Sequence, residues 1–284
     1  MYNSIIKNIS VFIFLIVSFF IFPKQLFASH AAGGEITYQW ISGSTYRINF
    51  IFYRDCAGTS EPANVTLAYS SNCTPSFCST IVLNKAATSS SGALNGTEIS
   101  IGCPNSPSRC VSTTSTIPGY REWVYTANVT LPSQCSIWKF YTCVNARNNA
   151  INNLVTPGNQ NLYVEATLNN LVAQGNSSPF FANKPTPYVC TGTPLNYSNV
   201  AIDPNNDSLV YDIIQPRTAN TATATCTTVP TNINFSSTIY NLTTNPLDCN
   251  NSFTFNPTNG QMSFTATNQQ VAALTARVRE YRNG

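Results

Sequence analysis

The sequence has few charged residues. Asp, Glu, Lys and Arg make up 9% of its 284 residues, whereas an average soluble domain has about 25%. Asn, Thr and Ser supply most of the polarity instead. Nucleic-acid binders draw their affinity from clustered Lys and Arg, so the composition argues against a nucleic-acid partner. The net charge of +3 also predicts no strong attraction to a membrane surface or to an acidic partner.

Histidine is almost missing, because His30 is the only one. A Ser-His-Asp triad would use it as the oriented base, and a position so close to the start of an exported chain suits that role poorly. The GxSxG and HExxH motifs are absent from the sequence. Two carboxylates could run glycoside hydrolysis, but no pair of acids stands out. The sequence therefore predicts a protein that is not an enzyme and that needs no cofactor, calcium excepted.

Long apolar runs are missing after residue 22. Before that point, Lys7 precedes an apolar run over 9–22, and the small residue Ala28 follows a polar break. This order is typical of a secretory signal peptide, here residues 1–28, with Ala31 as a second possible cleavage point. An uncleaved anchor is the alternative, but the run is shorter than the roughly 20 residues of a spanning helix. We expect a secreted, extracellular protein with no transmembrane segment in the mature chain.

Cysteine is abundant, and all ten cysteines follow the predicted signal peptide. An even number in an exported chain indicates disulfides, and zinc is disfavoured because CxxC spacing and a second His are missing. The expected disulfide residues are Cys56, Cys73, Cys78, Cys103, Cys110, Cys135, Cys143, Cys190, Cys226 and Cys249. Plausible local pairs are 73–78, 103–110, 135–143 and 226–249, which leave 56 and 190 to each other. The sequence alone does not fix this connectivity.

Apolar residues alternate with polar ones along much of the chain. Such a period of two, with many β-branched and aromatic residues, predicts half-buried strands. The expected strands are 35–40, 45–53, 123–131, 136–142, 162–168, 208–214, 261–266 and 274–281. No amphipathic helix longer than two turns is evident. The predicted fold is all-β, with two immunoglobulin- or cadherin-like antiparallel β-sandwich domains after the signal peptide.

Two prolines near residue 185 indicate an extended linker between the domains. The first domain is expected over 29–184, with long inserts, and the second over 185–284. The second domain ends in Asn283-Gly284, a dipeptide typical of β-hairpin turns, which predicts that a further strand follows. We therefore expect a domain truncated before its last strand, in the N-terminal piece of a longer protein.

One turn carries oxygen side chains at alternate positions. Asp203, Asn205 and Asp207 have the spacing of a calcium loop, and Asp212 or Asp248 could add ligands. The alternative is a turn in which an Asp side chain bonds the backbone, joining two strands. Calcium at these three residues is therefore a hypothesis.

Two further groups of residues have both a structural and a functional interpretation. Arg54 and Asp55 end a strand beside Cys56, where they could contact a ligand or, as we prefer, form an ion pair that holds the strand end. The aromatic residues Trp40, Tyr120, Trp123 and Trp138 could form a sugar-stacking platform. Strand alternation favours core packing for these aromatic residues.

Three stretches of the sequence resemble a known family. They are Ser29–Tyr38 with Tyr46–Gly58, then Ala201–Asp212, then Phe255–Phe264 with Val278–Gly284. Together they resemble the N-terminal region of large Bacteroidetes surface proteins, often labelled gliding-motility-associated or PKD-domain proteins. The resemblance implies an adhesin-like protein that continues into further sandwich repeats and a C-terminal type IX secretion signal.

These observations predict a non-enzymatic structural or adhesion module at the bacterial cell surface. Its expected partner is surface polysaccharide or another cell-surface protein. The alternative is the carbohydrate-binding module of a secreted enzyme, which predicts exposed coplanar aromatic residues on one sheet face. A hydrolase would instead show a cleft with two acids and a raised carboxyl pKa.

Overall fold

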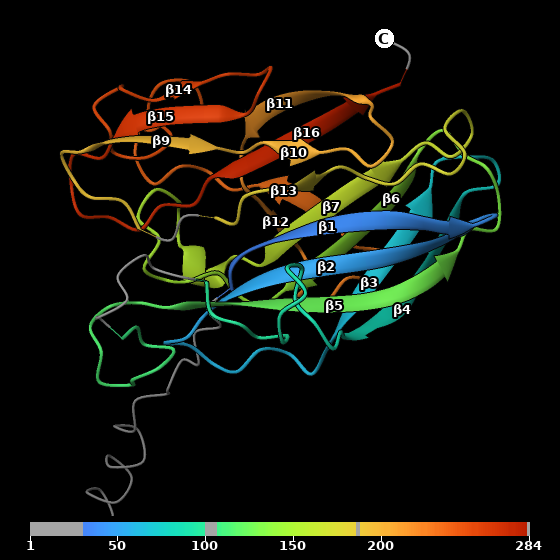
Figure 1. The fold of residues 1–284 in the computed structure, drawn as a ribbon, viewed down its shortest axis with the longest axis horizontal. Coiled ribbons are helices and arrows are strands. Elements are labelled where there is room, and N and C mark those ends of the chain that lie inside the picture. Colours follow the sequence, from blue (N-terminus) through green and yellow to red (C-terminus); the bar gives the residue numbers. More distant parts are fainter. Residues whose placement is uncertain (1–30, 100–106, 186–187, 283–284) are drawn as a thin grey trace, which may run out of the picture.

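The computed structural model describes residues 31–99, 107–185 and 188–282, whose regular secondary structure is almost entirely antiparallel strands (Figure 1). The predicted signal peptide, His30, Cys103 and Asn283-Gly284 lie outside the described residues. Within the described part, the one helical turn is η1 (Pro157–Asn159), and no helix there has the length and hydropathy to span a membrane. The all-β prediction is confirmed.

The first half of the chain forms a seven-stranded antiparallel sheet. Its strands are β1 (Ala31–Ser42), β2 (Thr45–Asp55), β3 (Asn64–Ser71), β4 (Phe77–Lys85), β5 (Tyr120–Thr130), β6 (Trp138–Val144) and β7 (Leu162–Leu168), in the order β1-β2-β5-β4-β3-β6-β7. Strands β4 and β5 pair at only two positions, Asn84 with Thr126 and Lys85 with Tyr125. The sheet folds over at this corner into two layers, and the Tyr38 hydroxyl on β1 donates to the Thr167 carbonyl on β7 at 3.0 Å.

The core lies between these two layers. Tyr46, Ile48, Phe50 and Phe52 alternate along β2 and are all buried, because every second residue of a strand points to the same face. The opposite layer contributes buried side chains that include Leu67, Trp138 and Phe140. Burial of each such side chain stabilises the fold by about 1.5–3 kcal/mol.

The second half of the chain forms smaller sheets around a second core. The further strands are β8 (Phe180–Phe181), β9 (Pro194–Ser198), β10 (Ala201–Ile202), β11 (Ser208–Ile214), β12 (Arg217–Ala219), β13 (Pro230–Asn232), β14 (Thr254–Phe255), β15 (Gln261–Thr265) and β16 (Thr275–Tyr281). Strands β14, β15 and β9 form one sheet, and β11 pairs with β16. Phe253 and Phe264 centre the core, against which Ile213 and Leu274 pack.

The two halves also contact each other through the segment after β11. Asn161, just before β7, donates its amide Nδ2 to the Ala219 carbonyl at 3.0 Å. Ala219 and Ala224 share a buried cluster with Tyr141 and Cys143 on β6. Strand β8 precedes residue 185 and pairs with β10 beyond it. The domain division at residues 184 and 185 remains a prediction, and the structure adds these contacts across it.

Three disulfides lie within the described residues, and all of them join distant parts of the chain. They link Cys56 to Cys110, Cys73 to Cys135, and Cys78 to Cys226, with sequence separations of 54, 62 and 148. The predicted local pairs, and the pair 56–190, are therefore wrong. Cys143, Cys190 and Cys249 are free, so the expectation that they form disulfides is also wrong.

The faces of the sheet explain why the local pairs fail. Cys73 packs against the first core and Cys135 belongs to it, whereas Cys78 lies near the Tyr141 hydroxyl at 3.9 Å. Tyr141 and Cys143 belong to the cluster on the other face. Cysteines close in sequence thus point to opposite sides of the sheet and cannot meet without backbone movement.

Candidate functional site

The turn between β10 and β11 contains the predicted calcium residues. One carboxylate oxygen of Asp203, Oδ1, accepts the backbone N–H groups of Asn205 at 2.8 Å and of Asp207 at 3.0 Å. This is the side-chain-to-backbone turn that the sequence offered as the alternative. Asp203 is buried in this turn. Its second carboxylate oxygen, Oδ2, takes no part in the turn's hydrogen bonds.

Three carboxylates meet at this turn. Asp203, Asp207 and Glu280 each place an oxygen within 4.8 Å of the others; we call these residues the acidic triad. Glu280 arrives from β16, because the pairing of β11 with β16 sets it opposite Leu209. Oδ2 of Asp203 is buried and has no hydrogen-bond partner among the described residues.

The other predicted ligands do not join the acidic triad. The amide oxygen of Asn205 accepts the backbone N–H of Ser177 at 2.9 Å. Asp212 binds Arg277 at 2.7 Å and Arg279 at 2.9 Å. Asp248 accepts bonds from the side chains of Thr267 and Asn268. The sequence missed Glu280, and only the strand register could have revealed it.

One guanidinium balances part of the acidic triad's charge. The Arg282 side chain donates to Asp207, with Nη2 2.6 Å from Oδ2, and also to the Asn176 side-chain oxygen at 2.6 Å. The Asn176 amide in turn donates to Glu280. Burial, and then the negative charges of Asp203 and Asp207, raise the pKa of Glu280 to about 7 against the Asn176 hydrogen bond. With all three acids ionised, two negative charges remain uncompensated.

The acidic triad lies where the second half of the chain docks on β1. The Ser178 hydroxyl accepts the Tyr38 backbone N–H at 2.9 Å, and the Ser177 hydroxyl accepts that of Trp40 at 3.0 Å. The backbone N–H of Ser178 donates to the Tyr38 carbonyl at 2.8 Å. Segment 176–178 therefore connects β1 on one side with Asn205 and Glu280 on the other.

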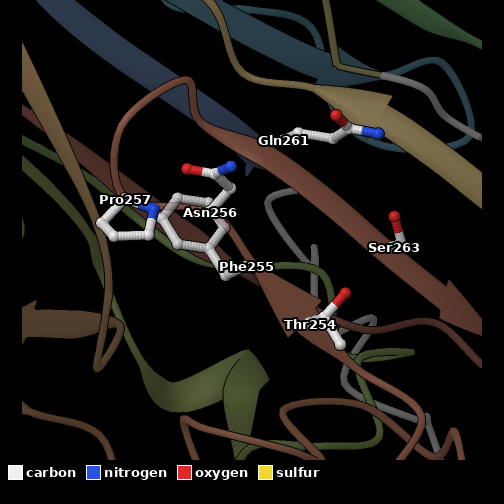
Figure 2. A pocket seen from close by; sticks show the side chains of 6 residues that line it. All are labelled: Thr254, Phe255, Asn256, Pro257, Gln261 and Ser263. Atoms are coloured by element: carbon white, nitrogen blue, oxygen red, sulfur yellow. The ribbon is translucent and has the colours of Figure 1, made fainter.

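A separate hollow of about 370 Å³ lies on the sheet formed by β14, β15 and β9 (Figure 2). Its lining residues are all uncharged: Thr254, Phe255, Asn256, Pro257, Gln261 and Ser263. Gln261 and Ser263 share one face of β15 because they are two residues apart, and Thr254 pairs with Ser263. The Ser263 hydroxyl donates to the Asn196 side-chain oxygen on β9 at 2.6 Å. The site offers rings, amides and hydroxyls, but no charge.

The aromatic residues singled out in the sequence do not gather on one exposed face. Trp138 is fully buried in the first core, and Trp123 packs against that core. The Lys85 ammonium nitrogen lies 4.3 Å from the centre of a Trp123 ring. Trp40 is exposed, while Tyr120 is half-buried beside Tyr188, with ring centres 6.3 Å apart. The core interpretation fits Trp138 and Trp123.

A second pair of acids lies on the outer face of β1, β2 and β5. Burial raises the pKa of Glu35 to about 7, with a further contribution from Glu122, although the Tyr53 hydroxyl donates to Glu35 at 3.0 Å. Glu122 is fully buried, accepts two bonds from Ser90, and lies 2.7 Å from the Lys184 ammonium. These glutamates do not line the Figure 2 hollow.

The ion pair between Arg54 and Asp55 stays a prediction, and the guanidinium of Arg54 lies 4.0 Å from the Glu61 carboxylate. Adjacent strand residues point to opposite faces. Arg54 donates to the carbonyls of Gly58 and Thr59, at 2.8 and 2.6 Å. Asp55 accepts the Ala57 backbone N–H at 2.8 Å and the Asn148 side-chain amide at 2.8 Å. Both residues hold the turn beside Cys56 through these hydrogen bonds.

No family model, curated protein or solved structure matches the chain. The geometry of the hollow and of the acidic triad is therefore the basis for assigning a function.

Proposed function

We propose that the chain is a non-catalytic, exported module of the bacterial cell surface that binds neutral polysaccharide in adhesion. The observation that carries this proposal is the uncharged hollow on β14 and β15. The long-range disulfides support an oxidising compartment. The sequence resemblance to gliding-motility-associated surface proteins supports a role as one part of a larger adhesin. Another cell-surface protein is the second possible partner.

The chemistry of the hollow suits a ligand rich in hydroxyl groups. Amide and hydroxyl side chains both donate and accept hydrogen bonds. Gln261, Asn256 and Thr254 could therefore donate to sugar hydroxyls or accept from them. Phe255 and Pro257 add apolar ring surface to the lining. With no charged side chain in the lining, the site has no electrostatic preference for an anionic or cationic ligand.

Affinity electrophoresis in gels containing neutral polysaccharides tests this proposal. The test variant is Thr254→Ala with Gln261→Ala. Both residues are exposed, and their side chains hold no hydrogen bond among the described residues, so the fold should be unaffected. Gln39→Ala, exposed on β1, is the matched control.

We expect neutral polysaccharide to retard the wild-type chain and the control variant. The double variant should bind at least about fivefold more weakly, because it loses two side chains whose hydrogen bonds contribute about 0.5–1.5 kcal/mol each. Wild-type protein that no neutral polysaccharide retards, or a double variant that binds like wild type, would refute the assignment to this hollow.

A carbohydrate-binding module attached to a secreted enzyme is the alternative, and the same hollow favours it. Both proposals predict sugar binding and differ in what the binding serves: the adhesin holds whole cells to a polysaccharide surface, whereas the module of a secreted enzyme brings that enzyme to its substrate. The raised pKa of Glu35 beside Glu122 is one of the features expected of a hydrolase. We propose that this pair is structural, so the chain should release no reducing sugar from any polysaccharide it binds. Release that Glu35→Gln abolishes would show the opposite.

A further inference from the structure

The acidic triad has the dimensions of a cation site. Calcium takes oxygen ligands at 2.3–2.6 Å, so two ligands on opposite sides of one ion lie about 5 Å apart. The three carboxylate oxygens of Asp203, Asp207 and Glu280 lie within 4.8 Å of one another. One ion could therefore contact all three without rearrangement of the backbone.

The buried carboxylate oxygen Oδ2 of Asp203 is the second feature of this site that points to a ligand. This residue is 8% exposed, and its Oδ2 has no hydrogen-bond partner among the described residues. A buried polar atom without a partner is costly, and more so when it carries charge. The other oxygen of the same carboxylate already holds the turn through two backbone N–H groups. The unpartnered oxygen is thus fixed in place and available to a ligand.

The charges around the acidic triad match a divalent ion. Arg282 pairs with Asp207, and no other ion pair to the acidic triad occurs among the described residues. Three carboxylates and one guanidinium leave two negative charges.

We infer that Asp203, Asp207 and Glu280 bind one calcium ion, which fastens the second half of the chain to the edge of β1. An all-oxygen ligand set suits calcium, whereas zinc prefers Cys and His. Magnesium demands a more regular octahedron, which a turn and a separate strand supply less readily. The ligand set differs from the sequence hypothesis, because Glu280 takes part and Asn205 does not.

The position of the acidic triad gives the ion its role. Asn176 bonds both Arg282 and Glu280, and its neighbours Ser177 and Ser178 bond the backbone of β1. A cation on Glu280 and Asp203 therefore stabilises the turn and β16 against segment 176–178. Calcium should protect this junction from proteolysis more than it protects the first sheet.

Isothermal titration of the EDTA-treated chain with calcium chloride tests the inference, and thermal unfolding with calcium or EDTA gives a second readout. The test variants are Asp203→Asn and Glu280→Gln. Asp203→Asn keeps the oxygen that accepts the turn's backbone bonds, so the turn should still form. Asp212→Asn is the control, because Asp212 lies on the same strand pair but is held by Arg277 and Arg279.

We expect one calcium site with a Kd of about 10⁻⁴–10⁻³ M, the range of extracellular modules. Each test variant should weaken binding at least about tenfold, as expected for loss of a ligand, and should abolish the calcium-dependent rise in Tm. The control should bind as wild type does. No saturable binding by the wild type up to about 10 mM calcium, or test variants that bind like the control, would overturn the inference.

Discussion

The disulfide between Cys78 and Cys226 carries the sharpest prediction about stability. It joins β4 to the segment between β12 and β13, across a sequence separation of 148. The segment it holds includes Ala219 and Ala224, which cover Tyr141 and Cys143 on the outer face of the first sheet. Replacing both cysteines by serine should loosen this cover before it disturbs either core.

The size of the effect follows from the closed loop. In the chain-entropy model a 100-residue loop contributes about 4.7 kcal/mol at 25 °C. The bond between Cys73 and Cys135 shortens the path from Cys78 to Cys226 to roughly that length. We expect the double variant to lose about 3–5 kcal/mol of unfolding free energy, measured by urea denaturation.

Thiol labelling gives a local readout of the same change. Cys143 is buried, and burial raises the pKa of its thiol to about 11, so it should resist maleimide in the wild type. In the double variant the cover opens and Cys143 should react. Cys249 is buried in the other core and should stay protected, while the exposed Cys190 should react in both proteins. Unchanged stability together with unchanged Cys143 labelling would refute this reasoning.

Three further predictions concern other parts of the fold. Gly34→Ala should lower the unfolding free energy by about 1–3 kcal/mol, because the new Cβ would lie 2.9 Å from the Ile51 carbonyl oxygen; a Tm equal to wild type would contradict this. In EDTA the Tm should fall as the pH rises from about 4.5 to about 7. Folding raises the pKa of Glu35 and of Glu280 from 4.5 to about 7, so the folded state binds more protons than the unfolded state in this window. A Tm that rises over the same window would contradict this prediction. Lys184→Met should destabilise the fold, by about 3 kcal/mol at most, because it leaves the buried Glu122 without its ion pair; denaturant unfolding at pH 8 would measure the loss.

The sequence predicts most of the long strands, because their alternation is strong. The expected 45–53 and 208–214 correspond closely to β2 (Thr45–Asp55) and β11 (Ser208–Ile214). Strands β3 (Asn64–Ser71) and β4 (Phe77–Lys85) were both missed. In β3, Val65 and Leu67 alternate and are buried, so its pattern was present but short. In β4, only Leu83 is buried, and Cys, Ser, Thr and Asn fill much of the rest. A strand with little buried surface leaves little hydrophobic pattern to detect.

The contacts between distant residues were not predictable from the sequence. The sequence indicates disulfides but not their partners, because pairing depends on which face of the sheet each cysteine occupies. Asp203 and Asp207 attract attention by their spacing, whereas Glu280 joins them only through the register of β11 and β16. The hollow on β14 and β15 has no sequence motif, because its residues gain meaning only when Thr254 pairs with Ser263.

Retention of protein-coated beads on a surface of neutral bacterial polysaccharide tests the central claim most directly. Beads that carry the wild-type chain should be retained under flow, and free polysaccharide should release them. Beads that carry the variant with Thr254→Ala and Gln261→Ala should be retained several-fold less, since the hollow loses two of its hydrogen-bonding side chains. Wild-type beads retained no better than uncoated beads would contradict the proposal that this protein is a polysaccharide-binding adhesion module.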